Sequence, residues 1–354
     1  MRVAIAPFFV VTAACLAIAA RGLLWAPPRS TDGIAVVDGR GHSVVLPRHA
    51  DRQAVFMGTG AGAYVLATRQ PGKIVTSASH VNERLKRSTY LARVLPDLSD
   101  MRLALTEMES GVGNQEVLLR EAVDVVVTWA RLAADYERLG LAVVGIPPVS
   151  TLDRVAQNTE VFASVVERAP EGAATVRRAN EARARIARDI ENTAGQPTRF
   201  SALLARGPDL WQFGLIFPEV SAAANGRDLR ESLTPGLGLD VEALLALNPE
   251  VIVTIGPNAQ DARETLLSHP ALGSMAAVKD RRVVCAPQGL SGYMSSIVDV
   301  PIYARWLADV LHRADPPAAR QQVVETLAAE FGERPTDAEI DDVLSCAPDT
   351  AHLH

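Results

Sequence analysis

The chain has 354 residues, of which 48% are apolar, 21% are charged and 5% are aromatic. This length and apolar content are sufficient for one or two buried cores and exceed what a single small domain needs. The formal net charge is −6, with both signs mixed along the chain. A nucleic-acid-binding protein would usually be basic, so this charge argues against a nucleic-acid partner.

The N-terminus has the composition of an export signal. Arg2 is followed by an almost uninterrupted apolar run from Val3 to Ala20, and Ala17-Ile18-Ala19 fits the small-x-small pattern of a cleavage site. We therefore interpret 1–20 as a secretory signal peptide and expect a periplasmic protein. Two alternatives stay open. One is an uncleaved membrane anchor, because an apolar run of about 18 residues nearly spans a bilayer. The other is lipidation at Cys15.

Residues 21–33 are rich in proline, glycine and arginine, which is typical of a flexible leader. Short apolar runs then alternate with helix-forming segments through 34–149, which predicts an α/β lobe. Its strands are expected at 43–47, 54–57, 73–76, 125–128 and 141–146, and its helices include 90–98 and 131–139. A glycine-rich turn at 58–62 lacks the complete phosphate-binding motifs, which argues against a nucleotide site.

A long helical connector is expected next. Ser150 is followed three positions later by Asp153, which is typical of a helix start. Helix-forming residues then continue to about Asn192, broken only by Pro170-Glu171-Gly172. We interpret 150–193 as one long helix, or two helices end to end, that forms a backbone between two lobes.

A second α/β lobe is predicted for 194–345. Strands are expected at 200–204 and 282–285, aromatic residues lie in a loop at 207–217, and closing helices are expected at 298–312, 317–331 and 336–344. Residues 346–354 form a tail.

An internal repeat links the two predicted lobes. The segment Glu116–Thr128 aligns without a gap on Glu242–Thr254. Each copy has an acidic residue that opens a short apolar helix, then a polar turn, then a run of β-branched residues. A continuous apolar run of this length is typical of a strand covered on both faces, and therefore of a parallel sheet flanked by helices. We predict two α/β lobes built on one plan, with a ligand cleft between them.

The mature chain would keep two cysteines, Cys285 and Cys346. They could pair in an oxidising compartment, but two cysteines without a spacing pattern give little support for a bond. We therefore favour two separate thiols and keep the disulfide as the alternative. The sequence has no CxxC motif and no Cys/His cluster with zinc spacing, so no metal site is predicted.

Four segments carry a resemblance to a known family, and they lie in order over nearly the whole mature chain: Val36–Pro47, Gly113–Leu119 with its strand, Leu239–Val253 and Gly332–Ile340. The chain resembles the extracytoplasmic substrate-binding proteins of ABC importers, in the helical-backbone class that serves iron-siderophore, haem and cobalamin uptake. One departure is Val123-Asp124, where that family usually has Pro-Asp.

The resemblance implies two Rossmann-like lobes joined by a long backbone helix. It also implies a monomer without catalytic residues or a resident cofactor, whose partners are a metal chelate and the permease dimer in the membrane. In this family one acidic residue on each lobe docks into the permease, and those positions fall on Glu116 and Glu242 here. Two carboxylates on two lobes would give a two-point electrostatic contact. The alternative is that each carboxylate only stabilises its helix N-terminus.

Ligands of open α/β sheets bind beyond the carboxyl ends of the strands. The candidate ligand contacts are therefore the polar and aromatic residues that follow each strand: Thr59, Tyr64, His80, Trp129, Arg131, Trp211, Phe213, Asn258, Tyr293 and Met294. Flat aromatic rings with one arginine and one histidine suit a large planar or chelated-metal ligand. The alternative roles are structural: Trp129 as a cap on the sheet core, Trp211 and Phe213 as packing under a loop, and Tyr64 in the helix interior.

The leading hypothesis is a receptor for a ferric siderophore, with haem, cobalamin and other metal chelates as alternatives. Two functions of other classes stay open. A chelatase-like enzyme would need a convergent acid/base or metal set, and a membrane-anchored ligand sensor would need an uncleaved N-terminal segment.

Overall fold

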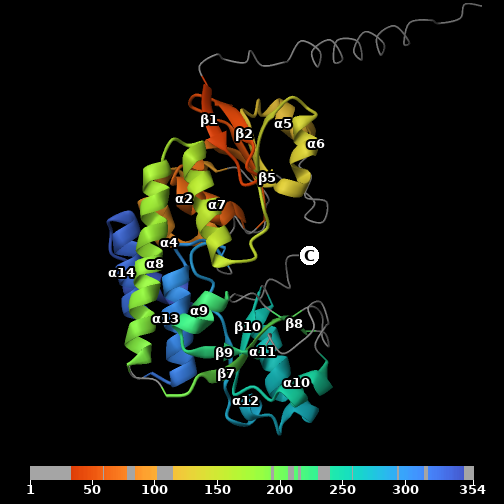
Figure 1. Ribbon diagram of the computed structural model, residues 1–354, viewed down its shortest axis with the longest axis vertical. Coiled ribbons are helices and arrows are strands. Elements are labelled where there is room, and N and C mark those ends of the chain that lie inside the picture. Colours follow the sequence, from red (N-terminus) through yellow and green to blue (C-terminus); the bar gives the residue numbers. More distant parts are fainter. Residues whose placement is uncertain are drawn as a thin grey trace, which may run out of the picture.

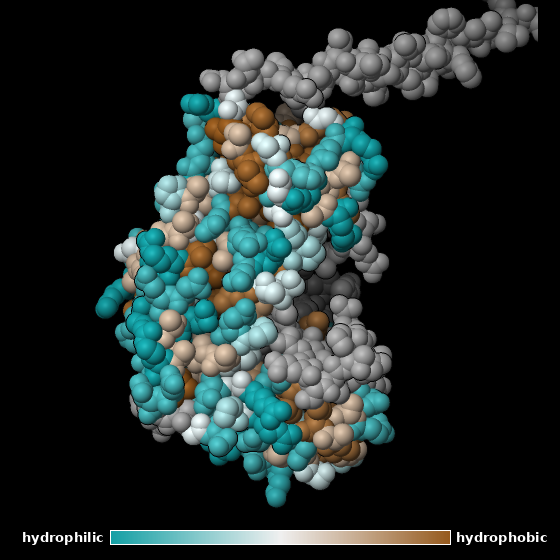
Figure 2. Space-filling view, viewed as in Figure 1, coloured by the Kyte–Doolittle hydropathy of each residue, from teal (hydrophilic) through white to brown (hydrophobic). Residues whose placement is uncertain are grey.

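The computed structural model describes residues 33–58, 60–77, 84–101, 115–192, 195–205, 211–213, 217–229, 240–256, 258–292, 295–314 and 318–346. In this part of the chain two α/β lobes lie one above the other, and helix α8 (Ala169–Glu191) runs along one side past both (Figure 1; space-filling view in Figure 2). The predicted fold class is therefore confirmed. The signal peptide, its alternatives and most of the leader fall outside the described residues, among which no helix is long and apolar enough to span a bilayer.

The N-terminal lobe is built on a parallel four-stranded sheet with the order β4-β3-β5-β6. Its strands are β3 (Gln53–Phe56), β4 (Ile74–Ser77), β5 (Val125–Trp129) and β6 (Ala142–Ile146). Its helices are α2 (Gly60–Thr68), α4 (Thr89–Val94), α5 (Gln115–Arg120), α6 (Ala133–Glu137) and α7 (Leu152–Val165). Val125 and Val127 face one apolar core and Val126 faces the other, so the run is apolar because both faces are covered.

The C-terminal lobe repeats this plan with parallel strands in the order β11-β10-β7. Strand β8 pairs with β7 in the antiparallel direction, and β9 pairs with β7 in the parallel direction. The strands are β7 (Thr198–Ala205), β8 (Trp211–Phe213), β9 (Gly226–Asp228), β10 (Val251–Ile255) and β11 (Val283–Cys285). The remaining helices are α9 (Pro218–Ala223), α10 (Val241–Leu247), α11 (Ala259–Ser268), α12 (Ala276–Lys279), α13 (Val300–His312), α14 (Ala319–Phe331) and α15 (Asp337–Leu344).

The sequence repeat corresponds to α5–β5 in one lobe and α10–β10 in the other. The acidic residue before each strand makes the same contacts: the Asp124 carboxylate accepts from the Arg52 backbone N–H at 3.0 Å, and the Glu250 carboxylate accepts from the Arg199 N–H at 3.2 Å. In return, the N–H of each acidic residue donates to the carbonyl of the same arginine. The repeat therefore ties each central strand to its neighbour in the same register, which confirms the prediction of two lobes on one plan.

Ala122 and Asn248 occupy equivalent positions of the repeat, and both have left-handed backbone conformations with φ of 46° and 41°. Asparagine tolerates this conformation, whereas a residue with an ordinary β-carbon is strained there. We expect Ala122→Gly to raise the free energy of unfolding by about 1 kcal/mol, because glycine removes the strain. Urea denaturation measures the change, with Asn248→Ala as a control expected to change stability in the opposite direction. A destabilised Ala122→Gly protein would contradict the expectation.

The Asp38 carboxylate lies in the turn of the hairpin β1 (Gly33–Val37) and β2 (Ser43–Pro47) and helps to attach it to the N-terminal lobe. Asp38 accepts from the backbone N–H groups of Arg40 at 2.9 Å, of His42 at 3.0 Å and of Gly145 in β6 at 3.0 Å. The guanidinium of Arg40 adds a bond of 2.6 Å. Burial alone would raise the pKa of Asp38, but these four hydrogen bonds outweigh it and leave the pKa below its ordinary value of 3.8.

Because the folded-state pKa is depressed, the Asp38 carboxylate stabilises the protein above its unfolded pKa, and this contribution is lost as the pH falls through the folded value. We expect Asp38→Asn to lower the free energy of unfolding at pH 7 by about 1.5–3 kcal/mol. The difference from the unsubstituted protein should shrink below about pH 4. Denaturation curves from pH 3 to pH 7 test this, and a difference that is independent of pH would contradict the ionised role.

The connector differs from the prediction. Two helices form, as one alternative allowed, but α7 and α8 lie side by side as a hairpin, not end to end. The chain reverses at Val166–Arg168, where Glu167 has a φ of 59°. Pro170 does not break the helix, because it lies in the first turn of α8, where no helical N–H bond is lost. Only α8 therefore spans both lobes, and α7 covers α2 in the N-terminal lobe.

The last two helices contact the N-terminal lobe, although the sequence assigned them to the C-terminal one. The hydroxyl of Tyr90 in α4 donates to the carbonyl of Leu327 in α14 at 3.1 Å. Arg93 pairs with Glu339 in α15 at 2.8 Å. The chain thus returns to its first lobe after α13, a long-range arrangement that local sequence patterns do not encode.

The expectation of two separate thiols is wrong, because Cys285 and Cys346 form a disulfide with a Cα–Cα distance of 5.6 Å. Cys285 ends β11, and Cys346 follows α15 directly. The residues are 61 positions apart and meet only because α15 returns to the edge of the sheet. The bond therefore connects the C-terminal sheet to a helix that packs on the N-terminal lobe.

Candidate functional site

The carboxyl ends of the two sheets meet between the lobes. Strand β3 leads into α2, and β11 leads into the segment Ala286–Gly292. A β-carbon added to Gly62 in α2 would lie 2.7 Å from the backbone carbonyl of Ser291 in that segment. This edge is where an open α/β sheet binds its ligands.

Trp129 lies at the N-terminal side of this edge. It is the last residue of β5, is partly exposed, and also packs against both apolar cores of its lobe. A β-carbon on Gly60, at the start of α2, would be 3.4 Å from the indole ring. Arg131 follows in the short 3-10 turn η3 (Ala130–Leu132) and is exposed. The structure thus brings the predicted Trp129 and Arg131 to one edge, with the glycine turn beside the indole.

The prediction that Tyr64 contacts the ligand is wrong. Its side chain is fully buried in the N-terminal core, its hydroxyl donates to Gln53 Oε1 at 2.7 Å, and its ring packs edge-on against Phe162. Burial raises the pKa of Tyr64 far above its ordinary value. Every residue of α2 is buried, so the position of Tyr64 one turn after the glycines places it inside the lobe.

The candidates of the C-terminal lobe occupy the corresponding edge. Trp211 and Phe213 belong to β8, where the sequence predicted a loop, and β8 pairs with the last residues of β7, Ala205 opposite Trp211 and Leu203 opposite Phe213. Asn258 follows β10, precedes α11 and is exposed. Its side chain makes no capping hydrogen bond to α11. Four candidates, Thr59, His80, Tyr293 and Met294, lie outside the described residues.

A buried polar cluster lies at the same edge and was not predicted. Asp299 is fully buried, and its carboxylate accepts from the backbone N–H groups of Leu290 at 2.8 Å and Ser291 at 3.0 Å. Burial raises the pKa of Asp299, although the hydrogen bonds from Ser291 and Leu290 act in the opposite direction. Arg84, from the N-terminal lobe, donates to the carbonyl of Gly289 at 2.9 Å. Gly289 and Arg84 are 205 residues apart, and no local sequence pattern connects them.

Glu116 and Glu242 are both exposed, each at the second position of its helix, α5 or α10. In α10 the N-terminus is already capped by Asp240, whose carboxylate accepts from the Ala243 N–H at 2.8 Å. Glu242 is therefore not the N-cap of α10, and its alternative role as a stabilising charge at the helix N-terminus stays open.

Two hollows of the described surface lie along α8. One of about 130 Å³ is between α8, α13 and α14, and a wider one of about 450 Å³ adjoins it. Their charged lining side chains balance in sign, four arginines against four carboxylates: Arg178, Arg185, Arg188, Arg305, Glu181, Asp189, Glu325 and Glu330. Among the described residues no group of three or more histidine, cysteine, aspartate or glutamate side chains is arranged to hold a metal ion.

No protein-family model and no curated protein matches the chain. Solved structures do match its fold. A periplasmic solute binding protein from Veillonella parvula is 18% identical with a TM-score of 0.68, and the match covers 88% of this chain and 96% of that one. The molybdate periplasmic binding protein MolA of a Haemophilus influenzae ABC transporter is 18% identical with a TM-score of 0.65, covering 86% and 99%.

A complex of Helicobacter pylori CeuE with nickel and histidine is 15% identical with a TM-score of 0.68, and the match covers 89% of this chain and all of that one (100%). A variant of the heme binding protein HmuT also matches, at 19% identity and a TM-score of 0.60 over 79% of this chain and 86% of that one. Each of the four matches covers at least 79% of this chain, so the likeness concerns its overall fold. The chain therefore has the fold of the periplasmic solute-binding proteins of ABC transporters.

Proposed function

We propose that the protein is an extracytoplasmic solute receptor that binds a metal chelate between its lobes and delivers it to an ABC permease. The observation that carries this proposal is the equivalent placement of Glu116 and Glu242. Each is an exposed carboxylate in the first turn of the repeat helix, one on each lobe of a fold shared with periplasmic solute-binding proteins. Two equivalent anionic points suit a permease whose two subunits are related by symmetry.

The described residues at the carboxyl edge of the two sheets favour a planar or chelated ligand. Trp129 offers a ring face, Arg131 a planar cation for an anionic chelate, and Asn258 an exposed amide from the opposite lobe. The proteins of similar fold are named for molybdate, nickel with histidine and heme. Because the described edge offers an aromatic surface and one cation, we rank a ferric siderophore first and haem or cobalamin next.

Intrinsic tryptophan fluorescence tests the function. The purified protein is titrated with ferric siderophores, haemin, cobalamin and molybdate, each with its absorbance corrected. Saturable quenching by a chelate, reduced in a Trp129→Phe variant, supports the receptor. A Trp306→Phe variant serves as the control, because Trp306 lies within α13, where its ring packs against the ring of Tyr303, and not at the end of a strand.

The same titration separates the receptor from an enzyme. A receptor returns the chelate unchanged after the protein is denatured, whereas a chelatase-like enzyme consumes it. Saturable binding followed by recovery of less than the added chelate, or no binding of any of these ligands, would overturn the proposal.

A further inference from the structure

We propose that Asp299 and Arg84 are positioning residues of the cleft, which seat the segment Gly289–Ser291 against α2 and so hold the two lobes at a fixed angle in the absence of ligand. The positioning role does not depend on the proposed function; only its expected effect on the affinity for the chelate rests on that function. The contacts that carry it connect β11 of one lobe with α2, Arg84 and α15 of the other.

Asp299 accepts hydrogen bonds from the turn that follows β11. Its carboxylate accepts from the N–H groups of Leu290 and Ser291 and from the Ser291 hydroxyl. The turn needs a left-handed residue, since Gly289 has a φ of 65° and a β-carbon there would lie 2.8 Å from Asp299 Oδ1. A fully buried carboxylate with three donors in one turn fixes the conformation of that turn, because each donor would otherwise lose a partner in a water-poor interior.

Arg84 links this turn to helix α15. Its guanidinium is nearly buried and donates to the carbonyl of Gly289 at 2.9 Å, to the Asp342 carboxylate at 2.7 Å and to the Asp342 carbonyl at 3.1 Å. The planar group has five N–H donors in a fixed geometry, so it can bridge acceptors that a lysine could not reach together. Arg84 thus joins the C-terminal turn to the last helix.

Gly62 explains how closely the lobes approach. An added β-carbon would lie 2.7 Å from the Ser291 carbonyl oxygen and 3.1 Å from its α-carbon, both backbone atoms that cannot rotate away. Backbone therefore packs on backbone at this point, and only glycine allows it. The turn lies in direct contact with α2, two residues from the Gly60 that adjoins Trp129.

The end of α15 secures the same turn from the other side. The N–H of Gln288 donates to the Ser345 carbonyl at 2.9 Å, and the N–H of Gly289 donates to the Val343 carbonyl at 3.1 Å. The disulfide Cys285–Cys346 lies beside these bonds. With this edge held by α15, Arg84 and α2, and the opposite edge by α8, the cleft is formed before cargo arrives. The binding free energy is then not spent on ordering the lobes.

The test measures lobe geometry directly. Spin labels are attached through unnatural amino acids at Ala134 and Lys279, exposed positions in α6 and α12, which leaves the disulfide intact. Pulsed electron paramagnetic resonance of the ligand-free protein then gives the inter-lobe distance distribution. We expect a single narrow distance, which becomes broader or shifts in Arg84→Met and in Gly62→Ala.

Arg320→Met is the matched control, because Arg320 also pairs with carboxylates of α15, Asp337 and Asp341, but within one lobe and at the surface. Its distance distribution should equal that of the unsubstituted protein. Asp299→Asn should act like Arg84→Met; if it fails to fold, Ser291→Ala removes one of the three donors and should broaden the distribution to a smaller degree. A merely structural role would lower thermal stability without changing the distance.

Haemin is the probe for the functional consequence. Arg84→Met is expected to bind haemin about tenfold more weakly than Arg320→Met, through loss of preorganisation. If the distance between the two spin labels is unchanged in both Arg84→Met and Gly62→Ala, the inference is wrong, whichever ligands the protein binds. Changed distances with no binding of haemin or any other chelate by the unsubstituted protein leave the positioning role standing and overturn the proposed function instead.

Discussion

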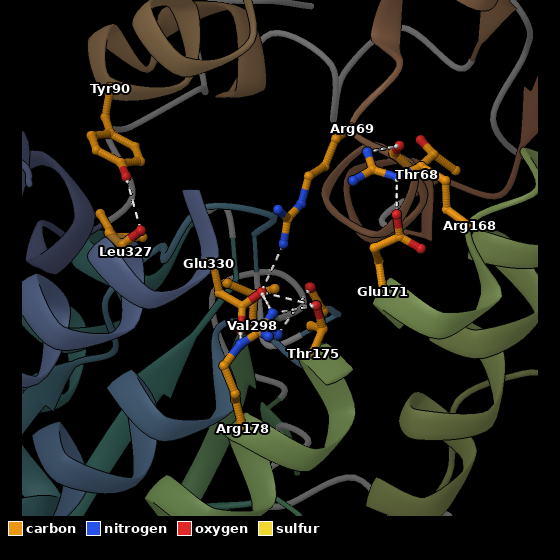
Figure 3. A network of polar contacts seen from close by, with 11 residues as sticks. Thr68, Arg69, Tyr90, Arg168, Glu171, Thr175, Arg178, Val298, Leu327 and Glu330 are labelled. Atoms are coloured by element: carbon orange, nitrogen blue, oxygen red, sulfur yellow. Dashed lines mark hydrogen bonds and ion pairs between the residues drawn. The ribbon is translucent and has the colours of Figure 1, made fainter. Parts of the chain in front are cut away.

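Replacing Glu330 with alanine is expected to lower the free energy of unfolding by about 3–5 kcal/mol. Glu330 in α14 is buried, and Figure 3 shows three side chains converging on its carboxylate. Arg69 donates at 2.9 Å, Arg178 donates twice at 2.6 and 2.7 Å, and the Thr175 hydroxyl donates at 2.9 Å. Removing the carboxylate leaves two partly buried guanidinium groups facing each other without a counter-charge. The expected loss is large for that reason.

Chemical denaturation at neutral pH measures the change. Glu333→Ala is the matched control, since Glu333 lies three residues further along and pairs with Arg93, but its side chain is 52% exposed. An exposed pair of this kind contributes about 0–1 kcal/mol. If both variants lost an equal and small amount of unfolding free energy, the Glu330 carboxylate would be solvated in solution, contrary to its buried position.

Glu330 also connects helix α14 to the N-terminal lobe. Arg69 directly follows α2, while Thr175 and Arg178 lie in α8, so one carboxylate joins the N-terminal lobe, the backbone helix and α14. Around it, the Arg69 guanidinium lies 5.1 Å from the centre of the Phe331 ring. These partners are 152 to 261 residues from Glu330. No local pattern predicts contacts of that range, so the sequence gave no indication that α14 also contacts the N-terminal lobe.

The features that were predicted correctly are those that depend on local order. The β-branched runs at 125–128 and 251–254 became central strands because their alternate side chains enter two cores. The acidic residues Glu116 and Glu242 are exposed because they open short helices whose next apolar residues face inward. Periodicity and helix-start signals are sufficient for both inferences.

The candidate site was predicted less well, because it depends on which side chains meet across the lobes. Tyr64 was chosen for its distance from a glycine turn, but α2 is covered on all sides and turns its tyrosine into the core. The pairing of Cys285 with Cys346 and the Arg84–Asp299 cluster both depend on the return of α15, which has no sequence signature. Trp129 was found because a strand end fixes its position without any long-range contact.

Simultaneous replacement of Glu116 and Glu242 by glutamine is expected to abolish delivery of cargo while leaving its binding unchanged. Loss of one partner of a hydrogen-bonded charge pair at an interface costs about 2–5 kcal/mol. Two such losses would reduce association with the permease by well over about a hundredfold. Each carboxylate lies in the first turn of the helix that precedes its strand, whereas Trp129 ends β5 and Asn258 follows β10, so we expect the affinity for the chelate to stay unchanged.

Uptake into cells or vesicles that carry the cognate permease measures delivery, and fluorescence titration measures binding. Glu171→Gln is the matched control, because Glu171 is also an exposed acidic residue in the first turn of a helix, but it belongs to α8 and pairs with Arg168. Each single variant should be impaired less than the double variant, because one electrostatic contact remains. High salt should weaken docking of the unsubstituted protein in the same direction.

The result also decides between the two roles of these carboxylates. If Glu116 and Glu242 only stabilised their helices, each replacement would cost about 0.3–1 kcal/mol of folding stability and leave uptake intact. The Glu171→Gln control would then behave in the same way as the repeat variants. Docking predicts the opposite pattern: normal folding and chelate binding with uptake lost in the double variant alone. The equivalence of the two positions in the repeat makes this pattern specific, since only residues that occupy the same place on both lobes can contact two symmetry-related permease subunits together.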